Sequence, residues 1–144
     1  MTPEKQLAGF MARYTPEIRT VARAALEKMR RRLPGAIELV YDNYNALVIG
    51  FGTTDQASDA LFSIVLYPRW VTLFFLRGAK LRDPKKVLKG SGKIVKHIVL
   101  QSADDLDKPE VRALMQQALG KTEFAGRQLV IKSISKKQRP RRPQ

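Results

Sequence analysis

A single change of pattern at Gly35 constrains the fold of this 144-residue chain more than any other feature. Before Gly35, apolar residues recur at helical spacing. After it come four short apolar runs, at residues 36–44, 46–52, 60–68 and 70–78, joined by brief polar or proline-bearing connections. Strands joined by such short connections pair antiparallel with their neighbours in sequence. The pattern therefore predicts an α+β fold in which helices precede an antiparallel β-meander.

Two helix starts come before this change. Thr2 and Pro3 predict the start of a short helix that runs to about Arg13. Thr15 and Pro16 predict the start of a longer one. The longer helix carries one continuous apolar stripe, formed by Ile18, Val21, Ala22, Ala25, Leu26, Met29 and Leu33.

The rest of the chain completes the predicted domain. A basic, glycine-bearing loop follows the fourth run, and a fifth strand is expected at residues 94–100. Residues 102–121 carry a second apolar stripe and predict a closing C-terminal helix packed on the sheet. We expect residues 1–120 to form one domain, residues 121–135 to add an arm or an edge strand, and residues 136–144 to form a flexible basic tail.

The composition excludes several kinds of chemistry. The chain has no Cys and one His, so it cannot form a thiolate zinc site, a disulfide or a Cys nucleophile. No nucleophile–base pair and no cofactor fingerprint is present, which predicts a protein that is not an enzyme and uses no cofactor. An acidic group lacks the order of a calcium loop and is better explained by helix capping than by a metal. It consists of Asp104, Asp105, Asp107 and Glu110.

The distribution of apolar residues also bears on where the protein works. No apolar leader opens the chain. No run approaches the ~20 apolar residues that a membrane span needs. We therefore expect a cytoplasmic protein with no membrane partner.

Positive charge dominates the composition. The chain holds 27 Lys and Arg against 13 Asp and Glu, for a formal net charge of +14. Part of this excess lies in a final segment whose basic residues are Lys136, Lys137, Arg139, Arg141 and Arg142. Such a tail favours nucleic acid, because neutralising phosphates releases their counterions. The alternative is a tail that only aids solubility.

The stretch Lys89-Gly90-Ser91-Gly92-Lys93 looks like a phosphate loop but has the wrong spacing. A nucleotide-hydrolase loop needs four residues between its glycines and a helix after its lysine, whereas here one residue separates the glycines and a strand follows. Two interpretations remain. One is an anion site at Lys89, Ser91 and Lys93, and the other is a turn whose glycines permit positive φ.

A second candidate site combines two predicted turns. Tyr41, Asp42 and Tyr44 lie at the end of the first strand, and Arg69 and Trp70 lie in the turn between the third and fourth. If both turns lie at the same end of the sheet, these side chains line a shallow pocket for an anionic or aromatic ligand. The alternative is that Asp and Asn form an ordinary turn while the aromatic rings pack in the core.

Two segments resemble the YdhG-like domain family, a domain of unknown function. "IRTVARAALEKMRRRLPGAIELVYDNYNALVIGF" is similar to its opening helix and first hairpin. "FSIVLYPRWVTLFFLRGAKLRDPKKVLKGSGKIVKHIVLQSADDLDKPEVRALMQQAL" is similar to its central strands, Gly-Lys loop and terminal helix. The resemblance spans roughly residues 15–120 and implies the same α+β fold. This chain has residues 41–45 where many members carry a Trp-Gly-x-Pro-type segment, and its basic core lacks the acidic surface that links one branch to iron.

These observations lead to two functional hypotheses. The first is a non-catalytic binding module for a small anionic or aromatic ligand. The alternative is a nucleic-acid-associated basic protein, in which the tail and the loop of residues 85–96 hold phosphates while Tyr or Trp stack on bases. An exposed edge of the meander also offers a surface for a homodimer.

Overall fold

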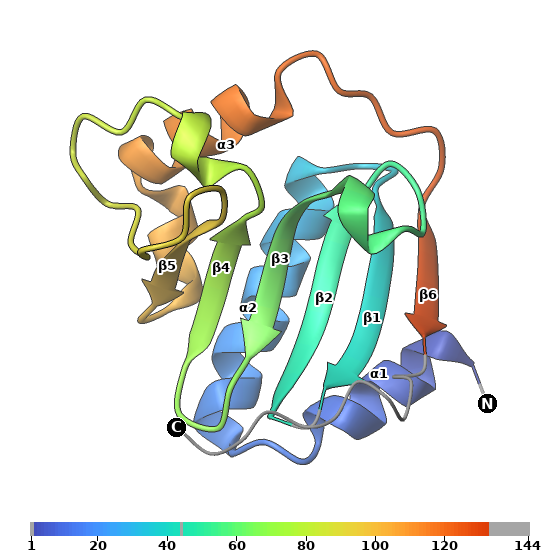
Figure 1. Cartoon of the computed structure of the whole chain (residues 1–144). Helices are drawn as coiled ribbons and strands as arrows, with labels where there is room; N and C mark the ends of the chain where they lie inside the picture. The colour runs from blue at the N-terminus through green and yellow to red at the C-terminus, as the bar shows by residue number, and fades with distance from the viewer. Residues whose placement is uncertain (1, 44, 133–144) are drawn as a thin grey trace.

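The computed structural model describes residues 2–43 and 45–132, and within them it shows an α+β fold with three helices and one open six-stranded sheet (Figure 1). The helices are α1 (Pro3–Met11), α2 (Pro16–Arg32) and α3 (Pro109–Leu119). The strands are β1 (Ile37–Asn43), β2 (Ala46–Gly52), β3 (Ala60–Leu66), β4 (Val71–Phe75), β5 (Lys96–Leu100) and β6 (Gln128–Lys132). Three 3-10 turns, η1 (Ala57–Asp59), η2 (Gly78–Lys80) and η3 (Ala103–Asp107), connect them. The predicted fold class is confirmed.

The strand order is β5-β4-β3-β2-β1-β6. Strands β1 to β5 pair antiparallel with their neighbours in sequence, as a meander does. Strand β6 lies within residues 121–135 and forms one edge of the sheet. It pairs with β1 in parallel, from Ile37 opposite Gln128 to Tyr41 opposite Lys132, so the sheet is mixed.

The two N-terminal helices start where the sequence predicts. The Thr2 side chain accepts a hydrogen bond from the Lys5 N–H at 3.2 Å, and the Thr15 side chain accepts one from the Ile18 N–H at 3.3 Å. Each threonine thereby satisfies one of the N–H groups that a helix start leaves without an internal partner. None of the helices in the described residues is both long and apolar enough to cross a bilayer.

The closing segment is interrupted where the apolar pattern predicts one continuous helix. Its first part is the 3-10 turn η3, and α3 begins only at Pro109. Lys108 between them is extended, with φ −61° and ψ 138°. A residue before proline disfavours the helical region because the proline ring crowds its backbone, which explains the break.

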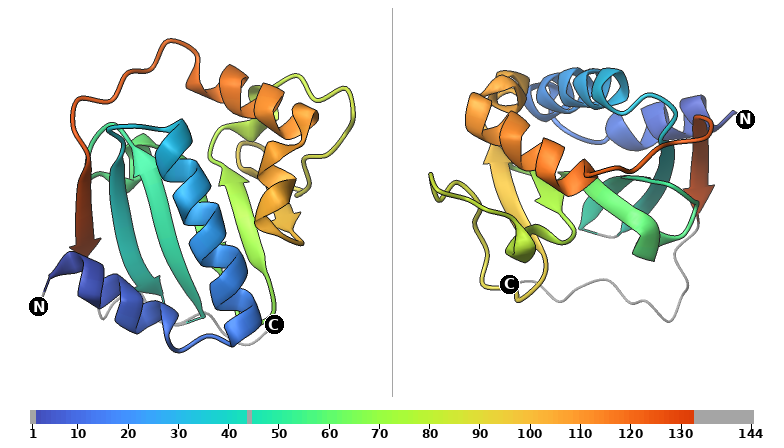
Figure 2. Two further views of the ribbon diagram at one scale, coloured as in Figure 1. Left: turned by 180° about the vertical axis from the view of Figure 1, so that it is seen from behind. Right: turned by 90° about the horizontal axis from the view of Figure 1, so that it is seen from above.

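All three helices cover one face of the sheet (Figure 2). The α2 residues that face the sheet include Ala22, Ala25 and Met29, each with no exposed surface. On the sheet, the rings of Phe62 and Phe75 meet edge to face with centroids 5.5 Å apart, and both are fully buried. Burying a side chain of this size contributes about 1.5–3 kcal/mol. The core therefore lies between the sheet and the helices.

The connection from α3 to β6 passes close to the turn after α2. Gly35 has φ +85°, and a Cβ added there would lie 3.0 Å from the Phe124 carbonyl oxygen. A side chain at this position would therefore be strained in its backbone and crowded by its neighbour. This glycine allows the segment after α3 to cross the start of β1 and reach the sheet edge.

Candidate anion-binding surfaces

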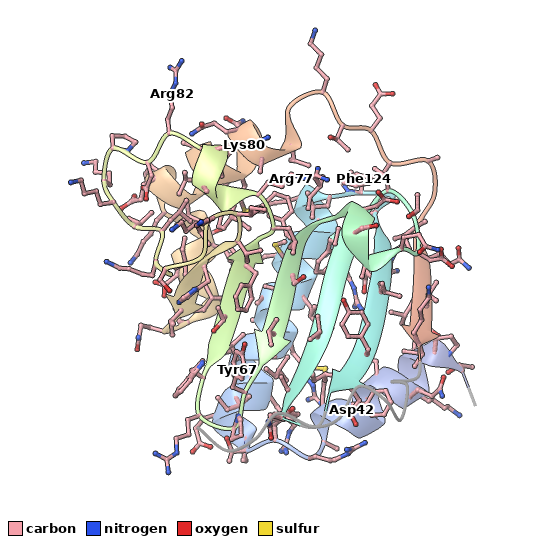
Figure 3. The ribbon with its side chains drawn as sticks, viewed as in Figure 1. Asp42, Tyr67, Arg77, Lys80, Arg82 and Phe124 are labelled. Atoms are coloured by element: carbon pink, nitrogen blue, oxygen red, sulfur yellow. The ribbon has the colours of Figure 1, made fainter. Side chains whose placement is uncertain are left out.

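The two predicted turns do lie at the same end of the sheet, which Figure 3 marks with the labels of Asp42 and Tyr67. Their residues do not all point the same way. Tyr41 and Asp42 alternate along β1, and Asp42 forms an ion pair with Arg13 beyond the end of α1, Nη1 to Oδ2 2.9 Å. Burial raises the pKa of the half-buried Tyr41 phenol. Tyr44 lies outside the described residues.

The β3–β4 turn presents a more accessible group. The rings of Tyr67 and Trp70 lie 5.8 Å apart, centroid to centroid, at an interplanar angle of 47°. The Tyr67 N–H donates to the Trp70 carbonyl at 2.9 Å, which closes the turn. Trp70 is 48% exposed, and Arg69 beside it is exposed as well. Trp70 therefore lies outside the core, and Arg69 and Trp70 are accessible together.

The Gly-Lys loop is a turn against the edge of β5. The Lys89 N–H donates to the His97 carbonyl at 2.8 Å, and the His97 N–H donates back to Lys89 at 2.9 Å. Gly90 has φ +113°, a conformation that glycine permits at little cost. Lys89, Ser91 and Lys93 are all exposed. The Lys96 ammonium donates to the Gly90 carbonyl at 2.6 Å, which brings a further cation to the loop.

This loop belongs to a larger group of cations, which we call the basic corner and define as residues 77–96. Its basic residues are Arg77, Lys80, Arg82, Lys85, Lys86, Lys89, Lys93 and Lys96. All of them except the half-buried Lys96 are exposed. Its one carboxylate, Asp83, accepts hydrogen bonds from the Val87 N–H at 3.0 Å and the Leu88 N–H at 2.9 Å. Among the residues that the structure describes, no cation of the basic corner forms an ion pair.

The basic corner is held to the rest of the domain by hydrogen bonds. The Arg82 N–H donates to the Gln117 side-chain oxygen at 2.9 Å, and the Gln117 amide donates back to the Arg82 carbonyl at 2.9 Å. The Ala79 N–H donates to the Ile94 carbonyl at 3.0 Å, joining the two ends of the segment. Figure 3 shows Arg77, Lys80 and Arg82 on this corner. Its backbone is therefore tied to α3 and β5.

On the helical side of the sheet, two groups of cations do have carboxylate partners. Arg30 of α2 makes two 2.8 Å hydrogen bonds to Glu38 of β1, a carboxylate that is 1% exposed. Arg127, just before β6, approaches the same carboxylate at 3.4 Å. The hydrogen bond with Glu38 raises the pKa of the Arg30 guanidinium, although burial opposes the shift. This group, in which only the Glu38 carboxylate is fully buried, joins α2, β1 and the approach to β6.

A second group on the helical side is not predicted by the sequence pattern. Lys28 and Arg32 of α2 and Arg112 of α3 all converge on the Asp107 carboxylate. We call these four residues the Asp107 cluster. The sequence predicts helix capping for Asp107, whereas its main partners in the structure are cations far away along the chain. The one feature of the sequence that indicates this cluster is the spacing of Lys28 and Arg32, which places both cations on the same face of α2.

Three comparisons of the chain with known proteins found no match. No family model matches the chain, and neither the curated proteins nor the solved structures include a match to it. The observed features define a small α+β domain with one strongly basic corner. The YdhG-like resemblance stays a prediction from the sequence motifs.

Proposed function

We propose that this protein is a non-catalytic binding module for an anionic ligand. The observation that carries the proposal is the basic corner, a segment with eight cations and a single carboxylate that is already hydrogen-bonded to backbone. Unpaired surface cations repel one another and raise the local positive potential, which an anion relieves on binding. Because the backbone of the corner is anchored, little ordering of the loop opposes binding.

The spread of these cations favours a polyanion, and nucleic acid is the ligand class that fits best. A small anion engages two or three cations, whereas a phosphate backbone engages many side chains along its length. No base-reading element is required for such contacts. The predicted role of the basic tail would add to this binding, with Lys136 to Arg142 as further phosphate contacts.

The salt dependence of DNA binding tests this proposal. We would measure duplex DNA binding by fluorescence anisotropy at several salt concentrations, for the full chain and for the triple variant Lys85→Gln, Lys86→Gln and Lys89→Gln. The slope of log K against log salt should fall by about 0.9 for each phosphate that is no longer neutralised, or about 2.7 for all three. The control triple variant Lys5→Gln, Arg23→Gln and Lys121→Gln removes the same charge from exposed positions outside the corner. Equal decreases in both variants, or no binding at low salt, would refute the proposal.

Removal of residues 136–144 separates the tail from the corner. If both contribute, the truncated chain binds more weakly than the full chain and still responds to the corner substitutions. If the tail alone binds, the truncated chain shows no salt-sensitive binding. That second outcome would show that the tail binds DNA and that the basic corner does not.

A small anionic or aromatic ligand is a second candidate, favoured by the Tyr67–Trp70 ring pair beside Arg69. Trp70 is the chain's only tryptophan, so its fluorescence reports directly on this turn. A screen of phosphorylated and aromatic compounds should find one that changes Trp70 emission and raises the melting temperature. Arg69→Ala should abolish both effects. Unchanged responses in that variant, or no hit at all, would exclude the turn as a ligand site.

A further inference from the structure

The Asp107 cluster contains more positive than negative charge. The Lys28 ammonium lies 2.7 Å from Asp107 Oδ2, while Arg32 and Arg112 share Oδ1, Arg112 at 3.4 Å. Asp104 approaches Lys28 only at 3.9 Å, and its side chain is 89% exposed. Three cations therefore depend mainly on one carboxylate. The surplus resembles that of the basic corner, but here it is partly enclosed between α2 and α3.

Arg32 and Arg112 differ in how many hydrogen bonds they make within the protein. Arg32 is mostly buried and donates to the Leu106 carbonyl, to the Met115 sulfur and to Asp107. Burial lowers the pKa of its guanidinium, and the positive charge of Arg112 lowers it further. Arg112 is 57% exposed and has only its long contact with Asp107, so most of its N–H donors find no acceptor among the described residues.

A pocket opens beside these arginines. Its volume is about 490 Å³, within the range of sites that hold small ligands. Arg32, Arg112 and the Gln116 amide supply its polar lining. The rest of the lining is apolar and consists of Pro109, Ala113, Met115 and Leu119. One part of the pocket is therefore cationic, and the other part can contact an apolar portion of a ligand.

We propose that this pocket binds a small molecule in which an oxyanion group is attached to a short apolar group, such as an organic phosphate monoester or a carboxylate. The planar guanidinium of Arg112 can donate two parallel N–H bonds to the oxyanion, as arginine does to carboxylate and phosphate. Arg32, held in place by its protein contacts, adds a second positive charge. The apolar group fills the space beside Ala113 and Leu119 and gains from leaving water. No residue of this site belongs to the basic corner, so the two proposals can fail separately.

The test uses phenyl phosphate, benzoate and inorganic phosphate as probes. Each is titrated into the ¹⁵N-labelled full chain while amide signals of α3 are followed by NMR. Phenyl phosphate or benzoate should shift the signals of Ala113 and Gln116 and should bind more tightly than inorganic phosphate. Arg112→Gln should weaken binding by at least about tenfold, since a hydrogen bond to a charged group is removed. Gln116→Glu, which places a competing carboxylate in the pocket, should weaken it as well.

Matched controls keep the test specific. Arg31→Gln removes the same charge one position before Arg32, from a side chain that is 67% exposed, and Gln56→Glu adds a carboxylate in the exposed loop before η1. Neither should change binding by more than about twofold, because screened surface charges act weakly at a distance. The proposal is wrong if no probe shifts α3 at millimolar concentration, or if the controls weaken binding as much as the pocket variants do. Arg112 and Gln116 are exposed, so their variants should fold, and amide spectra of the free variants verify this.

Discussion

Two basic regions of this protein differ in a way that their composition does not show. Helix α2 ends with Lys28, Arg30, Arg31 and Arg32, and each of them forms an ion pair with a carboxylate. In the described residues, the basic corner has none. Lys28, Arg30 and Arg32 pair with carboxylates of other elements, whereas the cations of the corner face solvent. The same residue types therefore have two different environments, and only spatial pairing separates them.

Breaking the buried pair on the α2 side should have the largest effect. Glu38→Gln replaces two charge-assisted hydrogen bonds from Arg30 with weaker ones to a neutral amide, and we expect a loss of about 2 kcal/mol in the free energy of unfolding. Urea denaturation followed by circular dichroism measures it. Glu27→Gln breaks the exposed Glu27–Arg31 pair and serves as the control, with an expected change within about 0.5 kcal/mol. Similar losses in the two variants would contradict the distinction between buried and exposed pairs.

Loss of the Asp83 carboxylate should loosen the basic corner. Asp83→Ala leaves the N–H groups of Val87 and Leu88 without their acceptor, and we expect a loss of about 1.5 kcal/mol. Hydrogen exchange should report faster exchange at these two amides than elsewhere. Asp59→Ala, which removes the 2.7 Å bond to Thr54 in an exposed loop, should leave both amides protected. Unchanged exchange in Asp83→Ala would show that the corner does not depend on this residue.

The Asp107 cluster should make stability depend on pH in the acid range. The hydrogen bond from Lys28, with Arg32 and Arg112 nearby, lowers the pKa of Asp107. The folded state therefore favours the ionised carboxylate. Its contribution is complete above the unfolded-state pKa, about 3.9, and is lost as the pH falls through the lower folded-state value.

Thermal unfolding between pH 2 and pH 7 checks this dependence. Asp107→Asn should lower stability at pH 7 and reduce the further loss on acidification. The control Asp55→Asn, in the exposed loop before η1, should follow the unmodified chain. If Asp107→Asn loses stability in parallel with the unmodified chain down to pH 2, the ion pairs of the cluster contribute nothing.

The smallest effect is expected at the corner cations themselves. Lys85→Gln removes an exposed ammonium that has no carboxylate partner among the described residues, so stability should stay within about 0.5 kcal/mol. At low salt it should rise slightly, because repulsion within the corner decreases. Arg30→Gln, the matched change on α2, should instead be destabilising because it leaves Glu38 buried with one weaker partner. A destabilising Lys85→Gln would mean that the corner has a structural role like that of α2.

Much of the fold could be predicted because its signals are local. The threonine caps, the α2 stripe and the four apolar runs each depend on residues close together in the chain. The break before Pro109 has a local signal too, since Lys108 precedes a proline. The positive charge of the candidate site was also predictable, because the lysines around Gly90 and Gly92 are close together in the sequence. The Asp107 cluster was not, because Lys28 and Asp107 are 79 positions apart and only folding brings them together.

The sequence by itself determined the order of helices and strands, the positive charge and the absence of cysteine chemistry, because these follow from local propensity and composition. Tertiary structure alone decided which cations are neutralised. It placed Glu38 against Arg30 and Asp107 among three cations. It left the cations of the basic corner without ion pairs among the described residues, where Asp83 is hydrogen-bonded to backbone instead. The physical reason is that an ion pair depends on distances of a few ångströms in space. That pairing distributes the positive charge of the described residues between regions where cations form ion pairs and one exposed corner where they do not.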